Sequence, residues 1–351
     1  MDRHIEALKV LKAGTVIPAT PLALDENRKF DPDRQRMITR YYMEAGAGGI
    51  ATAVHSTQFE IRLPEYNLFE TVISTVSDEI DKYEKETGRA IVKIAGVCGK
   101  TEQAVSEAQT AKRLGFDAVL LSPGGLNDMG EDYLIERAEA VAKVMPVIGF
   151  YLQPSVGGRV LTYSFWERFC EIDNVVAIKS APFNRYLTLD VARACALSSR
   201  CEDITLYTGN DDNIIPDLIT EYSFTKADGT TVTKKFEGGL LGHWCVWTNA
   251  VVKLFERIKK EGATAELLTL GAQITDANAV IFDFAHNFAG CIPGIHEILH
   301  RQGLLKGIWC LNPDEVLSEG QSEEIDRIYK MYPHLNDDEF VKEFIKRYEK
   351  I

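Results

Sequence analysis

A lysine closes a short apolar run that is typical of a buried strand. The run Val175-Val-Ala-Ile is followed directly by Lys179, so the lysine side chain is expected to point into the mouth of a sheet or barrel. Burial there disfavours the ammonium form, which lowers the pKa and exposes a nucleophilic amine. Such an amine can form an imine with a ketone. The structural alternative is a lysine that leaves its strand and extends its charged end into water.

Side chains suited to proton transfer and anion binding end two other apolar runs. Tyr151 closes the run Ile-Gly-Phe-Tyr, where a tyrosine can pass a proton to and from an imine. His55, Ser56 and Thr57 follow an earlier run. Their hydroxyls and imidazole, together with loop N–H groups, can hold a carboxylate. The alternatives are a packed aromatic residue for the tyrosine and an ordinary polar loop for the others.

Further candidates follow the last two runs. Asn210 and Asp211 are placed to orient substrate hydroxyls, although capping of a helix explains Asp211 or Asp212 equally well. His243 follows the final run and either contacts substrate or caps local structure. No cluster of histidine and acidic residues has the spacing of a metal site. An imine is itself an electron sink, so we expect neither a metal nor a cofactor.

Eight apolar runs alternate with longer amphipathic stretches, which indicates βαβ units. Several runs are apolar on both faces, as in a parallel sheet covered by helices. We therefore predict a (β/α)₈ barrel, whose active site lies at the carboxyl ends of its strands. An open doubly wound sheet is the alternative, but its glycine-rich phosphate loop is absent after the first run. The runs are Thr15–Ala19, Gly49–Val54, Ile91–Ala95, Ala118–Leu121, Val147–Tyr151, Val175–Ile178, Ile204–Tyr207 and Gly239–Leu241.

The barrel is predicted to carry an insertion and an extension. Residues 221–237 contain two β-prone arms around Asp228-Gly229, which is typical of a hairpin. We expect residues 1–242 to form the barrel with this insertion. Residues 243–351 are expected to form the last barrel helix and a helical extension packed on the barrel. In that part the helical stretches are Ala250–Lys260, Ala263–Asn287, Gly294–Gln302, Glu323–Met331 and Asp337–Lys350.

Bulk composition narrows the classes of function. The 351 residues suit one large α/β barrel with additions. Acidic residues outnumber basic ones, 52 against 39, and the net charge of −13 disfavours nucleic acid and anionic membranes as partners. Seven cysteines without a C-x-x-C pair indicate reduced thiols in a cytoplasmic protein. Residues 1–12 are charged and amphipathic, so we expect no secretory leader there, and no apolar run reaches the roughly 18 residues of a membrane span.

The tyrosine and lysine segments together resemble those of the dihydrodipicolinate synthase and N-acetylneuraminate lyase family of class I aldolases. Tyr151-Leu-Gln-Pro-Ser is similar to the family's Tyr-Asn-x-Pro-Ser, and Val176-Ala-Ile-Lys-Ser-Ala is similar to its Gly-Ile-Lys-Glu-Ala. Tyr207-Thr-Gly-Asn-Asp-Asp and Gly238-Gly-Leu-Leu-Gly resemble later family segments. The resemblance extends from about Gly14 to about Tyr332, nearly the whole chain.

This resemblance implies roles for three residues. Lys179 forms a Schiff base with a 2-keto acid, pyruvate or a sugar-derived acid, while Tyr151 shuttles protons and Ser56 relays them to the tyrosine. The resulting enamine either releases an aldehyde, as in an aldolase, or expels a hydroxyl, as in a dehydratase. We favour the aldolase. The resemblance also implies a homo-oligomer, either a tetramer or a dimer.

The sequence departs from the family pattern at three places. His55 replaces the first of two threonines, the one that helps to hold the keto-acid carboxylate. Ser122-Pro-Gly-Gly lacks the tyrosine that a neighbouring subunit lends to the proton relay. The substrate-binding arginine of the synthase falls on Val156, with Arg159 as a substitute. These departures argue against dihydrodipicolinate synthase itself and leave the second substrate open. A barrel that binds a keto acid without turnover is a further alternative.

Overall fold

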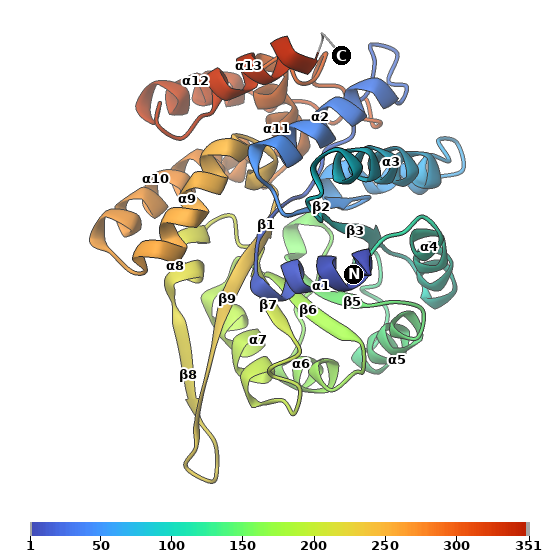
Figure 1. Ribbon diagram of the computed structural model, residues 1–351, viewed down its shortest axis with the longest axis vertical. Coiled ribbons are helices and arrows are strands. Elements are labelled where there is room, and N and C mark those ends of the chain that lie inside the picture. The colour runs from blue at the N-terminus through green and yellow to red at the C-terminus, as the bar shows by residue number, and fades with distance from the viewer. Residues whose placement is uncertain (1, 349–351) are drawn as a thin grey trace.

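Eight parallel strands form the centre of the computed structural model, which describes residues 2–348 (Figure 1). They pair in the order β1-β9-β7-β6-β5-β4-β3-β2, and a parallel bridge between Ala19 and Ala51 brings β1 against β2 and closes the barrel. The predicted (β/α)₈ barrel is therefore confirmed. The strands are β1 (Val16–Pro18), β2 (Gly49–Thr52), β3 (Val92–Val97), β4 (Ala118–Leu121), β5 (Val147–Leu152), β6 (Val175–Ala181), β7 (Thr205–Thr208) and β9 (Thr231–Leu241).

Helices cover the outside of the barrel, and polar side chains cap the N-termini of several of them. The Asp31 carboxylate accepts a hydrogen bond from the N–H of Arg34 at 3.1 Å, which caps the helix after β1. Thr162 caps the helix after β5 in the same way, through the N–H of Phe165. The helices are α2 (Pro32–Ala45), α3 (Phe69–Thr87), α4 (Thr101–Arg113), α5 (Glu131–Ala142), α6 (Tyr163–Cys170), α7 (Arg185–Leu197), α8 (Ile214–Ile219) and α9 (Thr248–Glu261).

The predicted hairpin is present between α8 and the last barrel strand. Strand β8 (Glu221–Thr225) pairs antiparallel with the first part of β9, and the ribbon projects at the lower left of Figure 1. At its turn the N–H of Lys226 donates to the carbonyl oxygen of Thr230, and Gly229 has a φ of +84°. Because β9 continues from the hairpin into the barrel, the predicted strand Gly239–Leu241 is only the end of a longer strand.

Further helices follow α9: α10 lies beside it at the left of Figure 1, and α11, α12 and α13 lie at the top, coloured orange to red. The predicted helix Ala263–Asn287 is too long, because Asp283 has a φ of +58° that interrupts helical geometry after Ile281. The Tyr41 hydroxyl on α2 donates to the Asp337 carboxylate at 2.6 Å, which ties the C-terminal helices to the barrel. These helices are α10 (Ala265–Ile281), α11 (Cys291–Arg301), α12 (Gln321–Met331) and α13 (Asp338–Tyr348).

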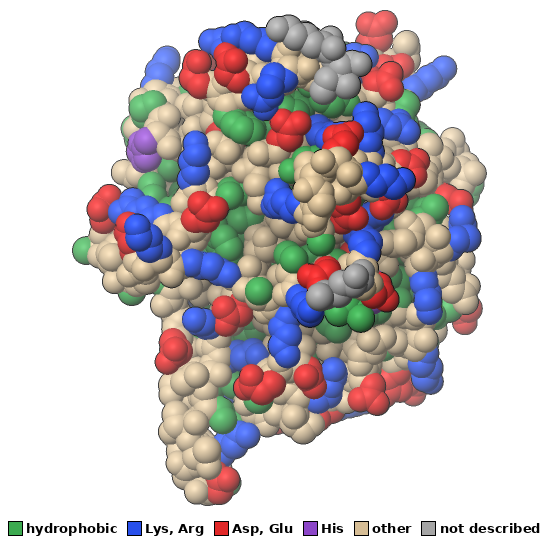
Figure 2. Space-filling view, viewed as in Figure 1, with side chains coloured by type: hydrophobic (Ala, Val, Ile, Leu, Met, Phe, Trp, Pro, Cys, Tyr) green, Lys and Arg blue, Asp and Glu red, His purple; other side chains and the backbone are tan. Residues whose placement is uncertain are grey.

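Charges are dispersed on the surface. Figure 2 shows acidic and basic side chains interspersed on one face, without a large region of a single sign. Within residues 2–348, none of the helices is both long enough and apolar enough to span a membrane.

An N-terminal helix closes the amino end of the barrel. Ala7 and Leu11 of α1 (Arg3–Ala13) belong to the apolar cluster that fills the barrel interior. The hydroxyl of Tyr207 on β7 donates to the Leu11 carbonyl oxygen at 2.7 Å. With this end filled by side chains, the carboxyl end of the barrel is the one left for a site.

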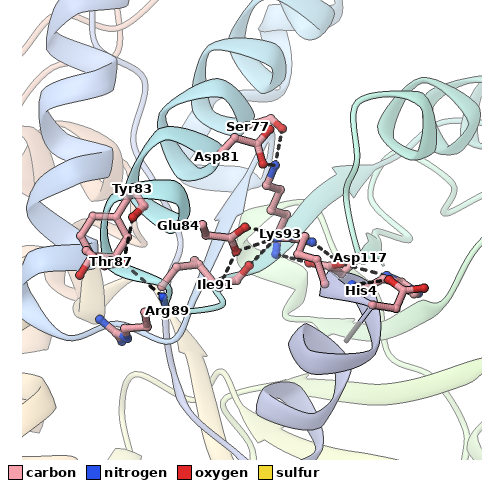
Figure 3. Close-up of polar contacts among 12 residues, drawn as sticks. His4, Ser77, Asp81, Tyr83, Glu84, Thr87, Arg89, Ile91, Lys93 and Asp117 are labelled. Atoms are coloured by element: carbon pink, nitrogen blue, oxygen red, sulfur yellow. Dashed lines mark hydrogen bonds and ion pairs between the residues drawn. The ribbon is translucent and has the colours of Figure 1, made fainter.

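A buried carboxylate fastens α1 to the barrel. Asp117, at the start of β4, accepts hydrogen bonds from the Arg3 guanidinium at 2.6 Å and from the N–H of Lys93 at 2.9 Å. A ring nitrogen of His4 lies 2.9 Å from the same carboxylate. Figure 3 shows His4, Lys93 and Asp117 drawn together at this junction.

We expect Asp117→Ala to lower the free energy of unfolding by about 2–4 kcal/mol. The change leaves the buried N–H of Lys93 without its acceptor and removes the anion that Arg3 faces. Urea unfolding followed by circular dichroism measures the effect. Asp132→Ala is the matched control, because its ion pair with Arg168 lies at the surface and is worth at most about 1 kcal/mol. Equal losses in the two variants would contradict this account.

Candidate active site

A cavity of about 70 Å³ lies at the carboxyl ends of the barrel strands, with Lys179 in its wall. We call it the inner cavity. Strand ends supply most of its lining and the C-terminal helices supply the rest. The lining residues are Ala19, Val54, His55, Ser56, Phe150, Leu152, Gln153, Val156, Lys179, Ala181, Phe183, Gly209, Asp211, Gly242, Phe282, Phe288, Cys291 and Ile295.

Lys179 lies within β6 rather than at its end, since the strand continues to Ala181. Its side chain points inward, and Nζ lies 4.4 Å from the centre of the Phe150 ring on the neighbouring strand. Burial lowers the pKa of the amine to about 8, against the opposing effect of the Asp211 charge. A larger share of neutral amine is therefore present near neutral pH than an exposed lysine would have.

Because Gly209 has no side chain, the side chain of Lys179 can occupy the space beside it. A Cβ atom at this position would lie 2.6 Å from Cε of Lys179 and 2.8 Å from Cβ of Ala181. Any side chain here would therefore displace the amine. Gly209 lies in the segment Tyr207-Thr-Gly-Asn-Asp-Asp, but no sequence pattern marks it as a site residue.

Asp211 is the acidic group that faces Lys179. Burial raises the pKa of its carboxyl to about 7, although hydrogen bonds from the backbone of His243 and Gly242 and the charge of Lys179 lower it. The N–H of His243 donates to Oδ1 at 2.9 Å. An acid with a pKa near neutrality can both donate and accept a proton at working pH.

His55, Ser56 and Thr57 form a short turn after β2, and the structure uses them differently. Burial, and secondarily the charge of Lys179, lowers the pKa of His55 to about 4, so the ring in the cavity is neutral at pH 7. The Ser56 hydroxyl lines the cavity but donates to the carbonyl oxygen of Ala19 at 2.5 Å. The Thr57 hydroxyl donates to the carbonyl oxygen of Thr20 at 2.6 Å. Thr57 does not line the cavity.

Tyr151 does not line the inner cavity, so the structure does not bring it together with Lys179, and its role as proton shuttle stays a prediction. Successive residues of a strand face opposite sides, and on β5 it is Phe150 that faces Lys179. Tyr151 points outward and packs on Trp166 of α6, with ring centres 5.3 Å apart. Its hydroxyl accepts from the N–H of Leu161 at 3.0 Å and donates to the carbonyl oxygen of Leu161 at 3.2 Å.

We expect Tyr151→Phe to leave kcat within about twofold of the wild type and to lower the free energy of unfolding by about 1–2 kcal/mol. The buried N–H of Leu161 loses its acceptor, whereas no group in the inner cavity changes. Steady-state kinetics and urea unfolding check both parts. A loss of turnover of a hundredfold or more without loss of stability would restore the tyrosine as a proton shuttle.

Three other predicted substrate contacts are engaged elsewhere. The guanidinium of Arg159 donates to the carbonyl oxygens of Leu126 and Met129 in the loop after β4. The amide of Asn210 accepts from the N–H of Phe183 and donates to the side chains of Thr188 and Asp217. The His243 ring is buried outside the inner cavity, between α8 and α9, and only the backbone of His243 reaches the site, through Asp211.

A second, larger cavity of about 630 Å³ lies against the inner one. We call it the outer cavity. Gln153, Phe183, Asp211, Phe282 and Phe288 line both spaces. The aromatic residues of the loop after α10 carried no sequence signal of a site, because their approach to the barrel depends on long-range packing. Within residues 2–348, no group of three or more His, Cys, Asp or Glu side chains is placed to hold a metal ion.

Comparison with known proteins places this arrangement in a sequence family. The profile of the Dihydrodipicolinate synthetase family matches residues 12–331. The 4-hydroxy-tetrahydrodipicolinate synthase of Desulforudis audaxviator is 25% identical over 205 residues, covering 58% of this chain and 65% of the relative. That of Clostridium novyi is 27% identical over 211 residues, covering 60% and 66%. The matches thus span just under two thirds of these curated relatives.

Solved structures share the fold at low sequence identity. The N-acetylneuraminate lyase of Fusobacterium nucleatum is 17% identical, with a TM-score of 0.70 over 92% of this chain and 99% of that chain. A dihydrodipicolinate synthase from Cyanidioschyzon merolae is 18% identical, with a TM-score of 0.73 over 91% and 98%. At these identities the likeness concerns the fold.

Proposed function

Because the chain belongs to the dihydrodipicolinate synthetase family, we propose that it is a class I lyase that forms a Schiff base between Lys179 and a 2-keto acid such as pyruvate. One observation carries the proposal: Lys179 is a buried amine with a pKa lowered to about 8, facing a cavity at the carboxyl ends of the strands. That placement and that pKa are what attack on a carbonyl carbon requires.

We propose that the keto-acid carboxylate binds at the turn after β2. In residues 2–348, the N–H groups of His55 and Ser56 donate no hydrogen bond to a protein acceptor, and both residues line the inner cavity. Two N–H donors suit a carboxylate. Neutral His55 adds a ring nitrogen to this turn. Because the ring carries no positive charge, it does not lower the pKa of Lys179 further.

Asp211 is proposed as the acid and base of the reaction. The neutral amine attacks C2, and Asp211 in its protonated form donates a proton to the departing hydroxyl, which leaves as water and gives the imine. Cleavage then breaks the bond between C3 and C4 of a 4-hydroxy-2-keto acid. The electron pair enters the enamine, and the C4 hydroxyl proton passes to the Asp211 carboxylate, which releases an aldehyde. Protonation of C3 and hydrolysis return pyruvate and free Lys179.

Imine trapping tests the proposal. The protein is incubated with pyruvate, reduced with borohydride and digested, and peptide mass spectrometry locates the adduct. We expect a pyruvate-derived adduct on Lys179. Lys93 is an internal control, because burial also lowers its pKa but its amine is held by Ser77 and Asp81 at the other end of the barrel. If a panel of 2-keto acids gives no adduct on Lys179, the protein is instead a keto-acid-binding barrel.

A further inference from the structure

The outer cavity has a chemistry of its own. Its walls carry four phenylalanines together with proline, valine, leucine and alanine side chains, and its described lining includes no lysine or arginine. Two carboxylates, Asp211 and Asp212, lie on its border. The guanidinium of Arg185 is already paired with Asp217 at 2.6 Å and lies 3.7 Å from Asp212. An aldehyde that bears a carboxylate or a phosphate would meet anions and no free cation of the lining.

Two of the neutral polar groups of the outer cavity are engaged with the protein itself. The Asn184 side chain accepts from the N–H of Tyr186 and of Leu187, as the cap of α7. Thr275 donates to the carbonyl oxygen of Asp212 at 2.8 Å. These two groups hold the protein's own backbone and are not free for a sugar hydroxyl, whereas Oδ1 of Asn278 is buried without a hydrogen-bond partner. Each sugar hydroxyl buried without a partner would cost affinity.

Aromatic rings form the wall between the two cavities. The rings of Phe183 and Phe288 lie 5.9 Å apart at 66°, and those of Phe284 and Phe288 lie 6.0 Å apart at 78°. Edge-to-face pairs of this kind are open to a further ring. Phe183 and Phe288 also have φ values of +51° and +67°. A bulky residue with positive φ is strained, and such strain is concentrated at ligand sites.

We propose that the outer cavity receives an uncharged aromatic aldehyde, so that the substrate is a 4-aryl-4-hydroxy-2-keto acid. This inference rests on the proposed function. The keto-acid end occupies the inner cavity at Lys179, and the aryl group at C4 projects past Phe183 and Phe288. Cleavage of the bond between C3 and C4 leaves the enamine of pyruvate on Lys179 in the inner cavity and the aryl aldehyde in the outer one, with the C4 hydroxyl proton on Asp211.

The rate of aldol condensation between pyruvate and different aldehydes measures the aldehyde preference of the outer cavity. Benzaldehyde, glyceraldehyde and succinic semialdehyde are each supplied with pyruvate, and kcat/KM is determined for each aldehyde. We expect benzaldehyde to be favoured by at least about tenfold, since burial of a phenyl ring is worth at least about the 1.4 kcal/mol that a factor of ten requires. Imine trapping on the same preparation distinguishes failure of the aldehyde assignment from failure of the proposed Schiff-base function. An imine on Lys179 with preference for another aldehyde overturns this inference alone, whereas no imine overturns the proposed function as well.

A matched pair of variants tests the absence of lysine and arginine from the lining of the outer cavity. Val160 lines the outer cavity and is 59% exposed, whereas Leu189 is 39% exposed and does not line it. Val160→Arg supplies the missing cation, and we expect the ratio of kcat/KM for succinic semialdehyde over benzaldehyde to rise by about tenfold. Leu189→Arg should keep the wild-type ratio. Equal ratios in the two variants would overturn the assignment of the outer cavity.

A second pair tests the aromatic wall. Phe284 lines the outer cavity and is 67% exposed, whereas Tyr186 is 83% exposed and outside it. Phe284→Ser should raise the KM for benzaldehyde by about fivefold, through loss of a ring contact, and Tyr186→Ser should not change it. An unchanged KM in Phe284→Ser would exclude this ring from the acceptor site.

Discussion

Replacing Lys179 with alanine is expected to lower turnover by about 10⁴-fold or more. The imine converts C2 into an electron sink, and no other lysine lines either cavity within the described chain. Removal of a covalent nucleophile leaves only binding and acid–base contributions. Steady-state release of pyruvate, measured with a coupled dehydrogenase, gives the loss.

Rescue separates chemistry from misfolding in this variant. The alanine leaves a space beside Gly209, and an added primary amine such as ethylamine can bind the ketone there as an external imine. We expect partial recovery of turnover that saturates with amine concentration. Lys112→Ala is the control, because this lysine lies on the surface of α4 and its amine donates to the carbonyl oxygen of Val144. Near-normal activity of Lys179→Ala without amine would exclude the Schiff-base mechanism.

The second large effect is expected for Asp211→Asn, with a fall in kcat of about 10²- to 10⁴-fold, the range of one general acid–base group. The amide keeps the shape of the side chain but neither donates a proton to a leaving hydroxyl nor accepts one from C4. A structural role alone would predict lost stability with kcat largely retained.

The pH dependence of imine formation distinguishes Asp211→Asn from variants that only lose stability. The Asp211 charge favours the ammonium form of Lys179 and so opposes the lowering of its pKa by burial. Without that charge the pKa of Lys179 falls below about 8, so neutral amine persists to lower pH. We therefore expect the acid limb of imine formation with pyruvate to move to lower pH in Asp211→Asn, even though turnover falls. Borohydride trapping across pH 5–9 measures the limb.

Asp212→Asn is the matched control for that limb. Asp212 is the next residue in the chain but does not line the inner cavity, and the pKa of Lys179 responds to burial and to Asp211. We expect the limb of Asp212→Asn to coincide with that of the wild type. If both variants shift it equally, a general effect of negative charge at the barrel mouth replaces the specific role of Asp211.

Strand order and position could be predicted from the sequence because they depend on local patterns. Ala118–Leu121 is observed with the predicted bounds, and the β8–β9 hairpin forms around Asp228-Gly229 as expected. Lys179 lies in the barrel as its apolar run indicated. Each of these features depends on residues within one short stretch.

The direction of single side chains was harder to predict. Phe150 and Tyr151 are adjacent aromatic residues, and a motif match fixes a position in the chain but not which of two neighbours faces inward. Arg159 and Asn210 have polar groups that suit a substrate, yet nearby carbonyl oxygens and side chains already bind them. Their partners, such as Leu126 for Arg159 and Thr188 for Asn210, are far enough along the chain that only the folded arrangement brings them near.

The contacts between the loop after α10 and the barrel mouth could not be predicted from the sequence. Phe282 and Phe288 line both cavities, but their sequence pattern is that of ordinary packing residues. Their role depends on the interruption of helical geometry at Asp283, where φ is positive. The Asp283 carboxylate accepts from the N–H of Gly290 at 2.8 Å and from the Ser318 hydroxyl at 2.5 Å, which holds the loop after α10 over the barrel mouth.

The order in which the chain builds the two cavities has an evolutionary consequence. The groups assigned to bond breaking, from His55 to Asp211, are complete before Gly262. Much of the outer wall comes from residues 275–288, beyond that glycine. Genetic recombination in the α9–α10 connection would therefore exchange much of the outer wall, together with four lining residues of the inner cavity, Phe282, Phe288, Cys291 and Ile295, while Lys179, His55 and Asp211 were kept. Descendants of such a barrel could diversify their substrates by modular replacement, without passing through an inactive ancestor.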